Sequence, residues 1–226
     1  GGGGVNDGGA GGFPESVQHR WWGRLRDAYC AAGRHHHTMD RLRGTLACAE
    51  ELSKRNGLGL GHRDAVFFAI LFHRLVSKPS APPVESARAS VEAWRSFASE
   101  AGIHAPSVEL VAQLIEQSAA LPGLPAQALP ADGPAAAPLA VFLDCVWSTL
   151  GESEARYARS VAELRLESSY EHDETGATFA QGRMALLEEM LRRDAIFRCK
   201  ATDEAELEAR ARKNVDAELK RLTQRA

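Results

Sequence analysis

The chain has 226 residues, 44% of them hydrophobic and 25% charged, and its formal net charge is -3. This composition suits one sizeable folded domain or two small ones, and it excludes a strongly basic nucleic-acid-binding protein, leaving only local patches for such a partner. The four cysteines form no CxxC pair and no apolar run approaches the roughly 18 residues of a membrane span, which argues against a zinc ribbon, a thioredoxin-type site and a membrane protein.

Helical periodicity runs through nearly the whole chain, and no segment shows the alternating pattern of a β-strand. Residues 1–14 are rich in glycine, and we expect them to form a disordered or extended tail. Residues 121–138, rich in proline and alanine, are expected to form an irregular insertion. The sequence therefore predicts an all-α fold with a single helical domain over residues 15–226. The expected helices cover residues 15–30, 38–55, 62–77, 84–101, 106–120, 139–150, 152–170, 175–192 and 203–225.

Three segments carry side chains that could bind a metal, each on or beside a different helix. The segment RHHHT, residues 34–38, places three histidines just before the second helix. His73 lies in the apolar third helix, and Asp144 enters an apolar segment further along the chain. A lone buried imidazole is most often a satisfied core group, and a buried carboxylate needs a metal, an arginine or backbone donors as its partner. Taken one at a time, these residues favour structural roles.

Taken together and in this order, the segments resemble the HD-domain superfamily of metal-dependent phosphohydrolases. The chain is similar to a family of small predicted phosphohydrolases whose pattern reads approximately RHYHT, then FHD, then LDADLxxLG. Here the corresponding segments are RHHHT at 34–38, FHR at 72–74 and LDCVWSTLG at 143–151. Residues 179–198 resemble the family's GR…L…L…IY stretch, and residues 208–219 its ExxARxNLxxEL ending. The resemblance spans about residues 20–222 and implies a single HD-like helical bundle.

The resemblance implies metal-ligand roles for His37, His73 and Asp144, with Mn, Mg, Co, Fe or Zn as the cofactor of an active enzyme. Two positions depart from the family pattern, because Arg74 replaces the aspartate of the HD pair and Arg41 replaces a further histidine. A guanidinium cannot coordinate a cation, and two positive charges about 4 Å apart repel by roughly 4 kcal/mol at an effective dielectric of about 20. We therefore expect a degenerate site without a metal, in which Arg74 pairs with Asp144 or, alternatively, points outward.

Three functions stay open at this point. The first is a catalytically inactive HD-like domain that acts as a structural or interaction module, for example with protein partners in a large assembly such as a mitochondrial ribosome. The alternative is a surviving metal-dependent phosphohydrolase acting on nucleotides or other phosphomonoesters, with Arg34 or Arg41 as a phosphate contact. The third is a metal-free pocket in which Arg74 and the neighbouring histidines bind an anionic phosphate compound. The compartment is expected to be the mitochondrion or the cytoplasm.

Overall fold

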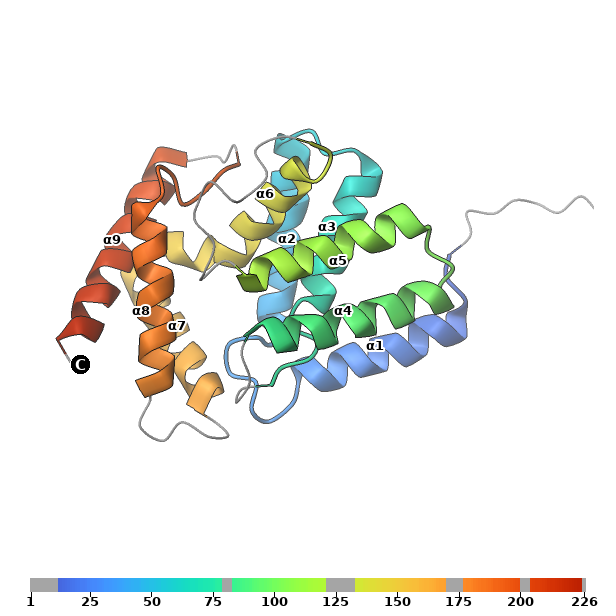
Figure 1. Ribbon diagram of the computed structural model, residues 1–226, viewed down its shortest axis with the longest axis horizontal. Helices are drawn as coiled ribbons and strands as arrows, with labels where there is room; N and C mark the ends of the chain where they lie inside the picture. Colours follow the sequence, from blue (N-terminus) through green and yellow to red (C-terminus); the bar gives the residue numbers. More distant parts are fainter. Residues whose placement is uncertain (1–11, 79–82, 121–132, 170–176, 200–203, 225–226) are drawn as a thin grey trace, which may run out of the picture.

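The computed structural model describes residues 12–78, 83–120, 133–169, 177–199 and 204–224. Within these ranges the chain is all-helical and contains no β-strand, which confirms the fold class predicted from the periodicity (Figure 1). Residues 1–11 of the glycine-rich tail and residues 121–132 of the expected insertion lie outside the described ranges. The elements are α1 (Glu15–Tyr29), α2 (Met39–Arg55), α3 (Leu60–Phe72), α4 (Pro83–Glu100), α5 (Ala105–Ala120), α6 (Ala136–Trp147), η3 (Ser148–Gly151), α7 (Glu154–Ser169), α8 (Ala177–Arg192) and α9 (Glu204–Thr223).

Helix α3 lies at the centre of the packing. It contacts α2, α4, α5 and α6, and it buries small as well as large apolar residues, among them Ala65, Ala69, Ile70 and Phe72. A helix that is apolar on most sides is stable only when neighbours cover those sides. Helices α7, α8 and α9 group at one end of the molecule, while α1, α4 and α5 form the other (Figure 1). None of the helices in the described part of the chain combines the length and apolarity needed to cross a membrane.

Aromatic rings fill the space between α1, α3 and α4. Trp21 of α1 packs edge-on against Phe97 of α4, with 5.7 Å between the ring centroids. Phe13 joins the same cluster, with its ring centroid 5.5 Å from that of Phe97. The sequence analysis assigned Phe13 to the glycine-rich tail, whereas its partly buried ring packs on this aromatic cluster.

Helix α3 ends at Phe72, five residues before the predicted end at residue 77. The backbone N–H of His73 still donates to Ala69 O at 2.8 Å. One of the last helix carbonyls, Leu71 O, has no partner within the helix and accepts from the hydroxyl of Tyr29 at 3.0 Å. In the turn that follows, Arg34 Nη2 donates to Arg74 O at 2.8 Å and to Leu75 O at 3.3 Å. This contact holds the RHHHT loop against the end of α3.

The segment after the insertion also differs from expectation. Helix α6 begins at Ala136, within the last residues assigned to the insertion, and Pro138 fits in its first turn where no backbone donor is needed. The end of the predicted helix forms the separate 3₁₀ turn η3. Gly151 closes this turn, and a Cβ there would lie 2.4 Å from Leu207 Cδ1. The glycine therefore allows α9 to pack closely on η3.

Buried polar side chains join α9 to the rest of the C-terminal group. Asn214 Nδ2 donates to Leu150 O at 2.8 Å and to Glu152 O at 2.9 Å. Arg183 of α8 makes a two-pronged ion pair with Glu218 of α9, at 2.9 and 3.0 Å. Charged groups that are buried in this way stabilise a fold only when they are well paired. These residues, which belong to the segments that resemble the HD family, therefore have structural roles.

Candidate functional site

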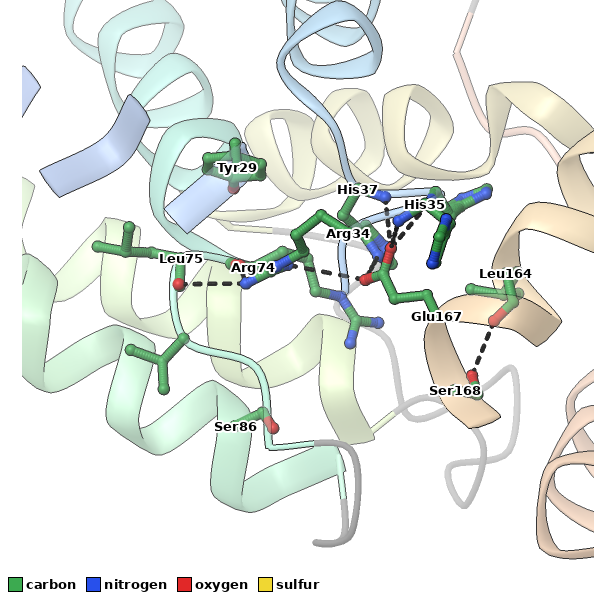
Figure 2. A network of polar contacts seen from close by, with 12 residues as sticks. Tyr29, Arg34, His35, His37, Arg74, Leu75, Ser86, Leu164, Glu167 and Ser168 are labelled. Atoms are coloured by element: carbon green, nitrogen blue, oxygen red, sulfur yellow. Dashed lines mark hydrogen bonds and ion pairs between the residues drawn. The ribbon is translucent and has the colours of Figure 1, made fainter. Parts of the chain in front are cut away.

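The loop between α1 and α2, residues 34–38, lies against α7 and is bound there by Glu167. The carboxylate oxygen Oε2 accepts hydrogen bonds from the backbone N–H groups of His35 at 3.2 Å, His36 at 2.8 Å and His37 at 2.8 Å. Figure 2 shows Glu167 reaching from α7 to this row of donors. Thr38 then caps α2 by accepting from the backbone N–H of Arg41. A single buried carboxylate thus determines the conformation of the histidine loop.

The other carboxylate oxygen of Glu167, Oε1, lies near two further groups. His37 Nδ1 lies 2.7 Å from Oε1, and Arg34 Nη1 lies 3.7 Å from it. The side chains of Arg34 and Glu167 are each only 8% exposed. Burial raises the pKa of Glu167, but the hydrogen bonds from His37 and from the backbone of the loop outweigh it and hold the pKa well below its usual range. Glu167 is therefore an anion throughout the neutral range.

The histidines His37 and His73 are neutral and face one another. Burial lowers the pKa of His37 to about 4 and that of His73 to about 3. Their ring centroids are 6.4 Å apart. His73 Nδ1 lies 2.9 Å from Ile70 O, and His37 Nδ1 bonds to Glu167. Because a carbonyl and a carboxylate only accept, each Nδ1 carries the proton and each Nε2 keeps its lone pair.

Asp144 lies on α6 and is 3% exposed. Its Oδ2 accepts from the backbone N–H groups of Arg198 at 2.8 Å and Cys199 at 2.7 Å, whereas Oδ1 has no hydrogen-bond partner among the described residues. Burial raises the pKa of Asp144 to about 6, against the opposing effect of the two backbone donors. The expected pair between Asp144 and Arg74 is not formed, because Asp144 binds the segment that precedes α9.

Arg74 follows the end of α3 and is half-buried. Burial lowers the pKa of its guanidinium; Glu167 attracts the charge and Arg34 repels it. Among the described residues, no carboxylate oxygen lies within 4.0 Å of this guanidinium. Arg74 instead lines a cavity of about 140 Å³. Its position therefore differs from a pair with Asp144 and from an outward orientation, and it agrees with the placement inside a cavity that the third function requires.

This cavity is enclosed by the histidine loop on one side and by α6, η3, α7 and α8 on the other. Its polar wall includes His36, His37 and Arg74, and no aspartate or glutamate among the described residues lines it. The apolar wall is formed by Val146, Trp147, Leu150, Leu186, Leu187 and Met190. A smaller cavity of about 40 Å³ shares the two histidines and also contains His73 and Arg41. Arg41 donates to Ser160 Oγ, which lines the larger cavity, at 3.0 Å.

The side chains at this site do not fit a divalent metal. His37 and His73 have the tautomer that a metal ligand requires, with Nδ1 bound to an acceptor and Nε2 free. However, no group of three His, Cys, Asp or Glu side chains in the described ranges is placed to hold a metal ion. Asp144 binds backbone donors, and Arg74 adds a positive charge beside His73.

The sequence located His37, His73 and Arg74, which the structure brings close together. It missed Glu167, which organises the site. The signal in the sequence is indirect: the loop presents consecutive backbone N–H groups and an arginine but contains no acidic residue, so an acid must come from elsewhere. Nothing local singles out Glu167 among the other glutamates of its segment.

Comparisons of the chain with protein-family models, with curated proteins and with solved structures give no match. The fold and the site define an all-helical protein with a cation-lined cavity beside a pair of neutral histidines. The similarity to the HD-domain superfamily stays a prediction from the sequence.

Replacing Asp144 with asparagine should stabilise the protein at pH 8. The folded-state pKa, about 6, lies above the ordinary value of 3.8, so the wild type gains stability as pH falls from about 6 towards 4. The amide avoids the buried charge, and we expect its advantage at pH 8 to be about 1–3 kcal/mol and to shrink below pH 6. Urea unfolding at pH 8, 6 and 5 measures this. Asp40→Asn, at an exposed ion pair on α2, is the matched control, and an equal pH dependence of Asp144→Asn and wild type would contradict the assignment.

Proposed function

We propose that the chain is a catalytically inactive HD-like domain that serves as a structural or interaction module within a larger assembly. A large intracellular complex such as a mitochondrial ribosome is the setting that we expect. The observation that supports inactivity is the arrangement of Glu167. Its carboxylate binds the backbone of the histidine loop, His37 and Arg34, so groups that would serve a metal-dependent reaction instead fix the loop to α7.

The position of Asp144 supports the same proposal. A metal-dependent phosphohydrolase uses its cation to polarise a phosphoryl oxygen and to activate water, and a carboxylate ligand offsets part of the cation's charge. Here the carboxylate hydrogen-bonds to two backbone N–H groups, and a guanidinium has replaced the acid next to His73. The chain therefore keeps His37 and His73, but the carboxylate of Asp144, which would help to hold a divalent ion, is bound to backbone donors instead.

The proposal is tested by metal binding and turnover. The purified chain should retain no stoichiometric Mn, Co, Fe or Zn and should show no phosphomonoesterase activity with added Mn²⁺, Co²⁺ or Mg²⁺. Arg74→Asp restores the acid of the family pattern and should increase Mn²⁺ affinity by tenfold or more, since it replaces repulsion with attraction. Tight metal binding together with turnover in the wild type would refute the inactive assignment.

The role within an assembly needs a separate experiment. An epitope-tagged chain, expressed at its natural level, should elute with one large complex when a native extract is separated by size. Treatment with high salt or nuclease then distinguishes a protein-held complex from one held by nucleic acid. Elution as a free monomer at low salt would count against the interaction module and would leave the metal result unaffected.

A further inference from the structure

The larger cavity carries an imbalance of charge. Arg74 lines its polar end, and two further charged groups, Arg34 and Glu167, lie next to Arg74 outside the cavity lining. The two arginines share one carboxylate, and His37 beside them is neutral because burial lowers its pKa. One positive charge is therefore not balanced by the described residues. The carboxylate of Glu167 is already engaged: it accepts hydrogen bonds from the loop backbone and from His37, and Arg34 Nη1 lies 3.7 Å from it.

The excess charge belongs to Arg74 and is directed at the cavity. Arg34 uses its Nη2 on the carbonyls that follow α3 and keeps its Nη1 near Glu167. Arg183, the other arginine that lines the cavity, is fully paired with Glu218. For Arg74, by contrast, no side-chain hydrogen bond or ion pair occurs within the part of the chain that the structure describes. A half-buried guanidinium in this position favours an external anion.

The apolar wall of the cavity determines what kind of group the ligand carries besides its charged head. Trp147, Leu187 and Met190 are nearly or fully buried apolar residues that line the cavity. The cavity volume of about 140 Å³ is close to the roughly 150 Å³ that accommodates one benzene molecule. Few convergent polar groups on a largely apolar wall are typical of small-molecule sites.

We propose that this cavity binds a small amphipathic oxyanion, a phosphate monoester or a carboxylate, whose charged head lies at Arg74 and whose apolar part lies against Trp147 and Met190. The neutral imidazoles of His36 and His37 offer Nε2 as an acceptor, which suits a head that also carries an O–H group. The inference goes beyond the proposed module, and it holds whether or not the chain is part of an assembly.

Binding is tested with phenyl phosphate, benzoate, inorganic phosphate and the neutral benzyl alcohol. The indole N–H resonances of the ¹⁵N-labelled protein report the position of the ligand, because Trp147 lines the cavity whereas Trp94 is buried elsewhere and donates to Val108 O. Phenyl phosphate or benzoate should shift the Trp147 signal saturably and leave Trp94 unchanged. Inorganic phosphate and benzyl alcohol, each lacking one half of the ligand, should bind at least about tenfold more weakly.

Variants identify the head group's partner. Arg74→Met should weaken phenyl phosphate binding by about tenfold or more, whereas Arg95→Met, at an exposed ion pair with Glu109, should not change it. A phosphate-only or benzoate-only response would assign the head group. The proposal would be overturned if phenyl phosphate bound Arg74→Met as tightly as the wild type, or if benzyl alcohol bound the wild type as tightly as phenyl phosphate. It would also be overturned if no ligand shifted the Trp147 signal saturably. If Arg74→Met fails to fold, the comparison of phenyl phosphate with benzyl alcohol in the wild type still decides it.

Discussion

Replacing Glu167 with glutamine should lower the free energy of unfolding by about 3–5 kcal/mol, the cost of removing one member of a buried charge cluster. The amide keeps an oxygen for the loop backbone but places an N–H₂ group where His37 and Arg34 need an acceptor. It also leaves two arginines without their anion. Urea unfolding at pH 7.5 measures the loss as a shift of the midpoint at unchanged slope.

The control for this variant lies one turn earlier on the same helix. Glu163 pairs at 2.8 Å with Arg159, which is 82% exposed, and its Oε2 lies 3.9 Å from the part-buried Arg41, so Glu163→Gln should cost about 1 kcal/mol, well below the loss expected at Glu167. A loss of similar size for Glu163→Gln and Glu167→Gln would show that Glu167 is no more than a surface acid.

A double-mutant cycle separates the charge from the hydrogen bonds. If Arg74 carries an excess positive charge, Glu167→Gln should cost less in an Arg74→Met background than in the wild type, by about 1 kcal/mol or more. The remaining cost then belongs to the loop backbone and to His37. Strict additivity would show that Arg74 and Glu167 do not interact, contrary to the charge imbalance at the cavity.

The helices could be predicted because their signal is local. Apolar residues at helical spacing, proline after a helix and turn-forming glycine all act within a few residues, so the order and type of the elements agree with the structure. Their ends were less certain. The periodicity predicts that helix α3 continues to residue 77, but the helix ends at Phe72, and in the turn that follows Arg34 from a distant loop binds the carbonyls of residues 74 and 75.

The partners within the site could not be predicted, since they depend on contacts between distant segments. Periodicity placed Asp144 in a buried helix correctly, yet it could not distinguish Arg74 from the backbone of residues 198 and 199 as its partner. Glu167 is 130 residues from His37 in sequence. Its role follows from how α7 packs beside the loop, which no local pattern encodes.

The C-terminal segments show why a resemblance can be informative about fold and silent about activity. Arg183 and Glu218 pair with each other, and Asn214 binds two carbonyls next to η3. Such residues are required to assemble α7, α8 and α9 whether or not a reaction takes place nearby. These residues are therefore needed for folding alone, because buried polar groups without partners would destabilise the fold.

Acid should destabilise the protein between about pH 6.5 and pH 4. Burial lowers the pKa values of His36, His37 and His73 to about 2, 4 and 3, while the unfolded chain titrates near 6.5. Below pH 6.5 the unfolded state binds more protons than the folded state, so the free energy of unfolding decreases as the pH is lowered. At pH 5, each histidine that stays neutral in the folded state lowers the free energy of unfolding by about 2 kcal/mol. Asp144, whose pKa is raised in the folded state, offsets part of this loss.

The prediction is checked by urea unfolding at pH 7.5, 6.0 and 5.0 and by following the imidazole resonances in the folded protein. The signals of His36, His37 and His73 should keep the shifts of neutral imidazole down to pH 5.5. His73→Gln should reduce the pH slope of stability by up to one proton, about 1.4 kcal/mol per pH unit. An unchanged slope would mean that His73 takes up a proton in the folded state. In that case the neutral histidine pair beside Arg74 would not exist, and the positive charge at the cavity would be larger in acid than the present balance allows.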